Sequence, residues 1–107
     1  MIDWSRINEL RDEAGDDAYE ELRDIFLSEV EEALARLGYD RGPTALAAEL
    51  HFLKGCAVNI GLADFAALCR KGEITAGTGT IATREIDELR QCFDASRTAL
   101  IGQAKAA

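Results

Sequence analysis

Apolar residues recur along this chain at intervals of three or four positions, the spacing of amphipathic helices, and no segment alternates as a half-buried strand would. The pattern predicts a short first helix over residues 3–14, with Asp3 able to cap its start and Gly15 able to end it. A second, longer helix is predicted from Asp17, which opens a sequence similar to a capping box, to a stop at Gly38.

The second predicted helix has an apolar side and an acidic side. We expect Glu29, Glu31 and Glu32 to form a solvated face, because runs of charge on a helix usually face water. Leu27 falls about 110° from the centre of the apolar stripe, so it is expected to be exposed, either without a role or within a surface that meets a partner. The stripe consists of Leu22, Ile25, Phe26, Val30, Ala33, Leu34 and Leu37.

The third helix is predicted to begin at Pro43, because proline fits a first helical turn, and to end at Gly61. Its inward stripe consists of Leu46, Leu50, Leu53, Ala57 and Ile60. A last helix is predicted from about Thr83 to Ala104. Its inward residues are Ile86, Leu89, Phe93 and Leu100.

A fourth helix, between these two, is predicted over residues 62–74, with Leu62, Phe65, Leu68 and Cys69 as its apolar positions. Gly72 is expected to loosen its last turn, so the pattern does not define where this helix ends. The stretch 75–80 is rich in glycine and threonine and is predicted to be a loop.

These elements favour an all-α fold over residues 1–107 as a single domain. We expect an antiparallel up-down four-helix bundle with a short additional N-terminal helix packed across one end. The sequence contains no Gly-rich phosphate loop after a strand, no serine elbow and no HExxH helix. Nothing in it therefore points to an autonomous nucleotide-using or hydrolytic site.

The chain is acidic, with 20 Asp and Glu against 12 Lys and Arg and a formal charge of -8. This balance provides no basic stripe for nucleic acid and no polybasic patch for anionic lipid. No stretch approaches the roughly 20 apolar residues of a membrane span, and the N-terminus does not have the pattern of a signal peptide. We therefore expect a cytoplasmic monomer that binds neither nucleic acid nor membrane.

Cys56, Cys69 and Cys92 are odd in number and lie among apolar residues at helical spacing, which favours reduced thiols in the core. A metal site is disfavoured because the chain has a single histidine, His51, which lies about 140° around the helix from Cys56. We expect no metal site.

His51 is a candidate functional residue because it is turned about 100° from Leu50 and so lies at the edge of the buried stripe or outside it. Gly55 follows one turn later, where glycine costs about 0.5–1 kcal/mol relative to alanine. Because helical side chains lean toward the N-terminus, a side chain at position 55 would cover the ring, whereas glycine leaves that space open. Lys54 can extend its ammonium group back toward the imidazole and attract an anion. Together these residues suggest a seat for a phosphoryl group on a nucleophilic ring nitrogen.

The stretch His-Phe-Leu-Lys-Gly, with the following Cys-Ala-Val-Asn-Ile-Gly, resembles the signature of histidine-containing phosphotransfer (HPt) domains, and the order of the helices resembles that family along almost the whole chain. The resemblance implies that His51 is phosphorylated, that Lys54 is the cation near the phosphate and that Gly55 gives access. Asn59 and Gly61 match the end of the motif, where we favour helix capping as their role. Gly72 departs from the leucine expected before the acidic residue of the fourth helix; neither it nor the 75–80 stretch is expected to touch the surface around His51.

The resemblance further implies a phosphocarrier without kinase or ATPase activity, which takes a phosphoryl group from the aspartate of one receiver domain and gives it to another. Its partners would be response-regulator receiver domains or a hybrid histidine kinase. It would need no cofactor of its own, since the receiver supplies the magnesium ion. Two alternatives stay open: a helical interaction module in which His51 is incidental, and a dimerisation and phosphoacceptor fragment of a histidine kinase.

Overall fold

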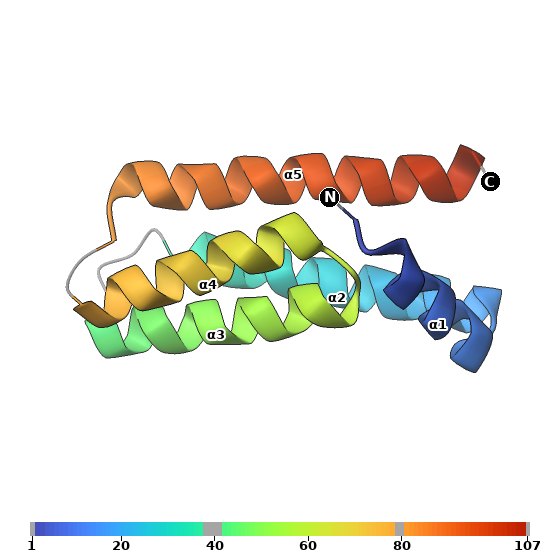
Figure 1. Ribbon diagram of the computed structural model, residues 1–107, viewed down its shortest axis with the longest axis horizontal. Coiled ribbons are helices and arrows are strands. Elements are labelled where there is room, and N and C mark those ends of the chain that lie inside the picture. Colours follow the sequence, from blue (N-terminus) through green and yellow to red (C-terminus); the bar gives the residue numbers. More distant parts are fainter. Residues whose placement is uncertain (1, 38–41, 79–80, 107) are drawn as a thin grey trace.

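The computed structural model describes residues 2–37, 42–78 and 81–106, and these residues form helices without a strand. The prediction of an all-α fold is therefore confirmed for the described part of the chain. The molecule is elongated, with extents of 42 × 21 × 20 Å. Its helices are α1 (Trp4–Ala14), α2 (Asp16–Arg36), α3 (Pro43–Asn59), α4 (Ala63–Thr78) and α5 (Thr83–Ala106) (Figure 1).

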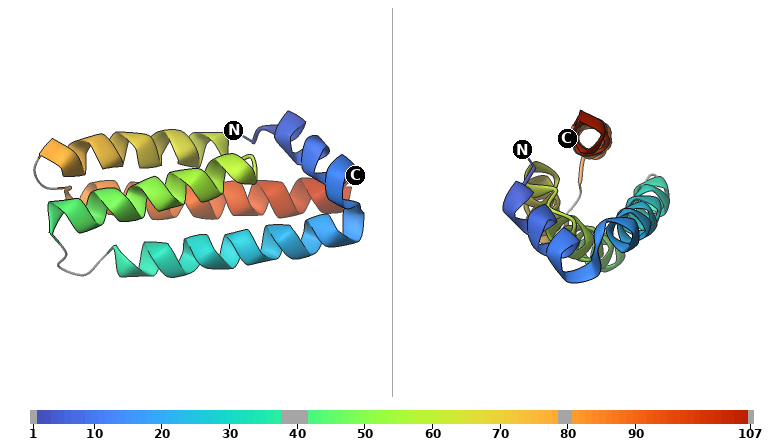
Figure 2. Two further views of the ribbon diagram at one scale, coloured as in Figure 1. Left: turned by 90° about the horizontal axis from the view of Figure 1, so that it is seen from below. Right: turned by 90° about the vertical axis from the view of Figure 1, so that its right-hand side faces the viewer.

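The four longer helices run side by side along the long axis, and consecutive ones point in opposite directions (Figures 1 and 2). The short α1 lies at one end, beside the start of α2. Helices α3 and α4 are the most closely packed pair, because only the tight turn around Gly61 separates them. This close pairing positions the side chains of the candidate site.

The break between α1 and α2 is a single glycine. Gly15 has φ 86°, a left-handed conformation that glycine adopts without strain, and its N–H donates to the carbonyl of Arg11 at 2.8 Å. Asp3 caps α1, as predicted, by accepting from the N–H of Arg6 at 3.3 Å. The capping box expected at Asp17 is wrong, because this sharp turn lets α2 begin at Asp16 without a side-chain cap. Gly38, the predicted stop of α2, lies outside the described residues.

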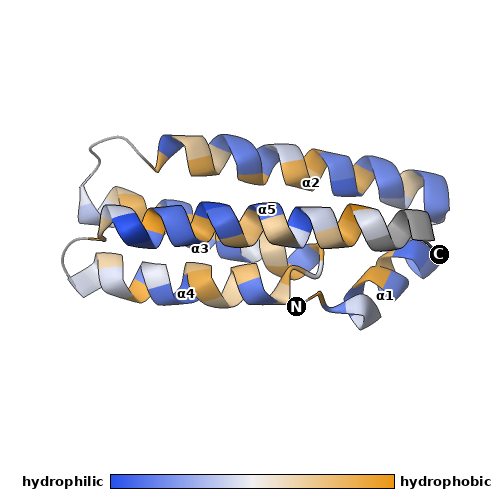
Figure 3. Cartoon of the chain, turned by 90° about the horizontal axis from the view of Figure 1, so that it is seen from above, coloured by the Kyte–Doolittle hydropathy of each residue, from blue (hydrophilic) through white to orange (hydrophobic). Residues whose placement is uncertain are grey.

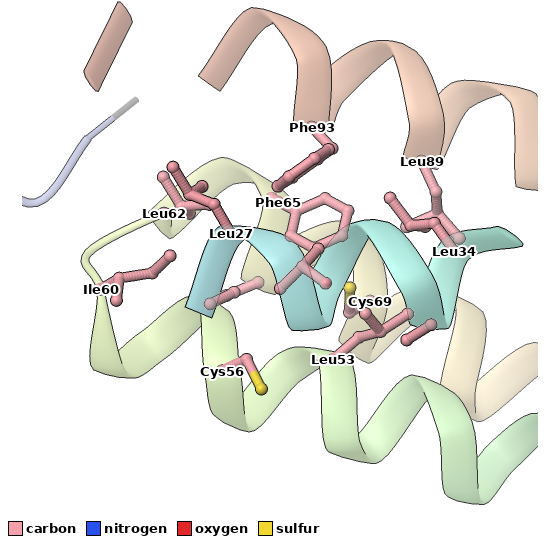
Figure 4. Close-up of a cluster of buried hydrophobic side chains, with 14 of the residues drawn as sticks. Leu27, Leu34, Leu53, Cys56, Ile60, Leu62, Phe65, Cys69, Leu89 and Phe93 are labelled. Atoms are coloured by element: carbon pink, nitrogen blue, oxygen red, sulfur yellow. The ribbon is translucent and has the colours of Figure 1, made fainter. Parts of the chain in front are cut away.

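The core receives apolar side chains from all of the described helices. Figure 4 shows part of it, with side chains from α2, α3, α4 and α5. The inward positions predicted for the last helix are all buried, and on α3 only Leu46 of the predicted stripe is partly exposed. The rings of Phe65 and Phe93 join α4 to α5, with centroids 5.5 Å apart. Each helix also shows polar positions between its apolar ones (Figure 3). The amphipathic pattern in the sequence therefore corresponds to a real inside and outside.

The prediction that Leu27 is exposed is wrong, and so is the inward placement of Ile25. Leu27 is 5% exposed and belongs to the same buried cluster as Leu62 and Phe65 (Figure 4), whereas Ile25 is 56% exposed. The reason is that the neighbouring helices cover a side of α2 that is not centred on its apolar stripe. The stripe alone therefore gives the wrong buried face for these two residues. Leu27 is therefore not available to a partner.

The fourth helix continues four residues beyond the predicted end, so the predicted loop is wrong for Thr75–Thr78; residues 79–80 lie outside the described part. Ala76 is fully buried and holds this stretch against the core. The Thr75 hydroxyl donates to the carbonyl of Lys71 at 3.0 Å, a bond that is compatible with a helix. Gly72 does not loosen the helix: it is buried in the interior of α4.

The turn after α3 ties the N-terminal segment to the bundle. The N–H of Asp3 donates to the carbonyl of Gly61 at 2.7 Å, and the Arg6 Nε donates to the carbonyl of Asn59 at 3.1 Å. Gly61 has φ 73°, and the N–H of Leu62 bonds back to the carbonyl of Ala57 at 2.8 Å. Gly61 therefore ends α3 as predicted, and Asn59 is the last residue of that helix.

Candidate functional site

His51 lies on the outward side of α3, and its side chain is 67% exposed. The flanking Leu50 and Leu53 are fully buried, so the backbone that carries the ring is held firmly by the core. The prediction that the imidazole lies outside the core is confirmed. The ring is thus accessible from solvent on a rigid support, which a group that reacts with a partner protein requires.

One ring nitrogen of His51 is engaged by a residue that neither the helical periodicity nor the histidine motif singles out. The Nδ1 atom lies 3.0 Å from Oε1 of Glu73 on α4. A carboxylate can only accept a hydrogen bond, so Nδ1 donates, and in the neutral ring the free lone pair is then on Nε2. Glu73 therefore selects the ring tautomer whose nucleophilic nitrogen is Nε2.

Lys54 completes the arrangement through the same carboxylate. Its Nζ lies 3.5 Å from Oε2 of Glu73, so Glu73 binds the imidazole with one oxygen and the ammonium group with the other. Ion pairs as exposed as this one contribute little to stability, about 0–1 kcal/mol. The sequence predicts that Lys54 extends directly toward the ring, whereas the structure connects it to His51 through Glu73.

Gly55 is exposed on the face of α3 that carries His51. A Cβ placed on it would have no heavy atom within 4 Å, so no neighbouring helix requires a glycine there. Phe52 and Val58 on the same helix are 45% and 58% exposed, so two large apolar side chains lie on its solvent-facing side. The surface beside His51 therefore combines open space with apolar side chains.

The cysteines offer no competing nucleophile. Cys56 and Cys69 are buried, as the sequence predicted for core cysteines, whereas Cys92 is partly exposed; all three are free thiols. Burial raises the pKa of the Cys69 thiol to about 12, and burial likewise raises the pKa of Cys56 and that of Cys92. Thiols with raised pKa values stay protonated and unreactive near neutral pH.

Other features of the described residues do not contribute to this site. No group of three or more His, Cys, Asp and Glu side chains among them could hold a metal ion. None of the helices in the described part is long and apolar enough to cross a membrane. A cavity of about 260 Å³ lies between α5 and the N-terminal segment, lined by residues such as Trp4 and Cys92 and not by the His51 group.

The sequence does contain one indication that Glu73 lies near His51, which is the spacing of the two residues around the turn. When two helices are joined by a very short turn, residues at similar distances before and after the turn face each other. His51 precedes Gly61 by ten positions and Glu73 follows it by twelve. The tight turn therefore indicates which part of the fourth helix lies beside the histidine.

A comparison with protein-family models finds that the model described as Hpt domain matches residues 21–99, which includes all four longer helices in whole or in large part. The comparisons with curated proteins and with solved structures gave no significant match.

Proposed function

Because this chain belongs to the Hpt domain family, a family of phosphorelay phosphocarriers, we propose that His51 accepts a phosphoryl group from the phospho-aspartate of one receiver domain and passes it to an aspartate of another. The observation that carries this proposal is the exposed imidazole whose Nδ1 is bound by Glu73 and whose Nε2 is left free. The overall arrangement proposed is the antiparallel up-down bundle that the alternating helix directions support (Figure 1).

In the proposed step, the Nε2 lone pair of His51 attacks the phosphorus of the acyl phosphate. A nitrogen–phosphorus bond forms, the bond to the aspartate oxygen breaks, and the receiver's carboxylate leaves with the electron pair. The proton on Nδ1 stays in place, so the ring becomes positively charged. The Glu73 carboxylate at 3.0 Å balances this charge, as an aspartate does for the histidine of a serine protease.

Lys54 and Gly55 support the same step in different ways. The ion pair with Glu73 holds the ammonium group of Lys54 near the ring. In the phosphorylated protein the same ammonium group can also pair with the phosphoryl oxygens. Gly55 leaves the approach to the ring open. The proposal assigns no cofactor to this chain, and the magnesium ion is expected in the acidic pocket of the receiver.

The partner-binding surface in this proposal is the exposed side of α3. Phe52 and Val58 provide apolar contact area beside His51, and a small apolar surface suits a brief encounter between a carrier and a receiver. The partners proposed are response-regulator receiver domains or the receiver of a hybrid histidine kinase. The chain itself is proposed to act as a cytoplasmic monomer without kinase or ATPase activity.

A transfer experiment tests the proposal. The protein is mixed with receiver domains that carry labelled phospho-aspartate, and label that is labile in acid and stable in base is expected to appear on it. The variant His51→Gln should keep the helical circular dichroism of the wild type, because the side chain is exposed, and should take no label. If the wild type takes no label from a panel of receivers of the same organism, the alternative of an interaction module with an incidental His51 is favoured.

A further inference from the structure

Gly72 lies in the interior of α4, where nothing in the backbone requires a glycine. The residue has no positive φ and lies far from either helix end. Glycine in such a position costs about 0.5–1 kcal/mol relative to alanine. The cause of a glycine at position 72 must therefore lie in the side chains that surround it.

The surroundings of Gly72 are crowded. A Cβ on this residue would lie 3.3 Å from Cδ1 of Leu50 and 3.5 Å from Cδ1 of Ile81. Leu50 is fully buried, so it has little freedom to move away. The space next to Gly72, between α4 and α5, is a cavity of about 20 Å³, which has room for about one water molecule. A larger side chain at this position would need the space that the end of the Leu50 side chain occupies, so either Leu50 shifts or α4 moves away from α3.

Leu50 and Gly72, which pack together here, are the chain neighbours of the two residues joined by the hydrogen bond of the site. Leu50 precedes His51 on α3, and Gly72 precedes Glu73 on α4. We propose, on the basis of the function proposed above, that Gly72 is a positioning residue: it lets α4 approach α3 closely enough for the Glu73 carboxylate to reach His51 and Lys54 together.

The distances make this reach sensitive to the spacing of the helices. The Nδ1 to Oε1 distance of 3.0 Å is within the range of a good hydrogen bond, and an increase of about 0.5 Å would take it out of that range. The Oε2 to Lys54 Nζ distance is already 3.5 Å. Because Glu73 uses both oxygens, a rotation that restores one contact lengthens the other. Displacement of α4 therefore loosens the control of the His51 tautomer.

The test uses a graded pair of variants, Gly72→Ala and Gly72→Val, with Gly77→Ala as the matched control. Gly77 is on the same helix, but a Cβ there meets nothing within 4 Å. Two quantities are measured in each folded variant: the ring ¹⁵N chemical shifts of His51, which report the tautomer, and the rate of transfer from a phosphorylated receiver. The first needs no phosphorylation, so it tests this inference even if the proposed function is wrong.

The expected result is a graded loss. Gly72→Val should shift the ring from the single Nδ1–H tautomer toward a mixture and slow transfer about tenfold, and Gly72→Ala should do so less. Gly77→Ala should change neither quantity. In a Glu73→Ala background, where the ring has already lost its partner, Gly72→Val should have no further effect on either readout.

Two outcomes would overturn the inference. One is a folded Gly72→Val protein with the wild-type tautomer and the wild-type transfer rate. The other is an effect of Gly72→Val that is undiminished when Glu73 is absent, since that would show that the glycine acts by another route. If Gly72→Val does not fold, Gly72→Ala decides by the same two criteria.

Discussion

Substitution of Gly55 should make the protein more stable. Gly55 is in the interior of α3 and has an ordinary helical conformation, and a Cβ added to it would meet no heavy atom within 4 Å. Gly55→Ala therefore gains helix propensity without a clash, about 0.5–1 kcal/mol in the free energy of unfolding. For a domain of this size, that gain corresponds to an increase of about 2–8 °C in Tm.

The same position should be sensitive to a larger side chain for a chemical reason. In Gly55→Gln the side chain leans toward the helix N-terminus and covers His51, so it obstructs the incoming acyl phosphate. We expect transfer to slow about tenfold or more while Tm equals or exceeds that of the wild type. Gly102→Gln is the matched control, because Gly102 is also helical, exposed and uncrowded and lies on α5, which carries none of the site residues, and it should leave the transfer rate unchanged.

Thermal melts and a transfer time course, normalised to the folded fraction, separate access from packing. Lower Tm values for Gly55→Ala and Gly55→Gln, combined with an unchanged transfer rate per folded molecule, would refute the reasoning. That result would mean that Gly55 serves the packing of the helix rather than access to His51.

Three further predictions concern stability and assembly. Gly61→Ala should lower the free energy of unfolding by about 2 kcal/mol in a urea titration, because it strains a left-handed residue and places a Cβ 2.8 Å from the Asp3 carbonyl; an unchanged midpoint would contradict this. Burial raises the pKa of the Cys69 thiol, so the stability that this thiol contributes is fully present below about pH 9 and is lost as pH rises toward 12. Between about pH 8 and about pH 10.5 the free energy of unfolding of the wild type should therefore fall by about 2 kcal/mol more than that of Cys69→Ala; an identical pH dependence of the two proteins would count against the cause we assign. The charge of -8 opposes self-association, and sedimentation at micromolar concentration should show a monomer rather than a tight dimer.

The sequence predicted those features that depend on local periodicity and on single residues with one clear role. The starts and ends set by Asp3, Gly15 and Gly61 appear as expected, because each follows from backbone chemistry within a few residues. The exposed position of His51 follows from its angle to Leu50 on one helix. Local rules are sufficient where the cause is local.

The failures arise where a neighbouring helix decides the outcome. The exchange of roles between Ile25 and Leu27 depends on which helices cover α2, and the helical state of Thr75–Thr78 depends on the burial of Ala76. Gly72 is expected from the sequence to lie away from the surface around His51, yet it packs on Leu50 and directly precedes Glu73, which reaches the ring. Periodicity within one helix contains no information on the register between two.

The central claim is that His51 carries the phosphoryl group, and the most direct test is to locate the phosphate within the chain. The protein is incubated with a phosphorylated receiver and then fragmented under conditions that preserve phosphohistidine, and the modified residue is identified by mass spectrometry. The account predicts phosphate on His51 in the wild type and none on the folded His51→Gln variant. Phosphate on any other residue, or modification of the variant at the wild-type rate, would contradict it.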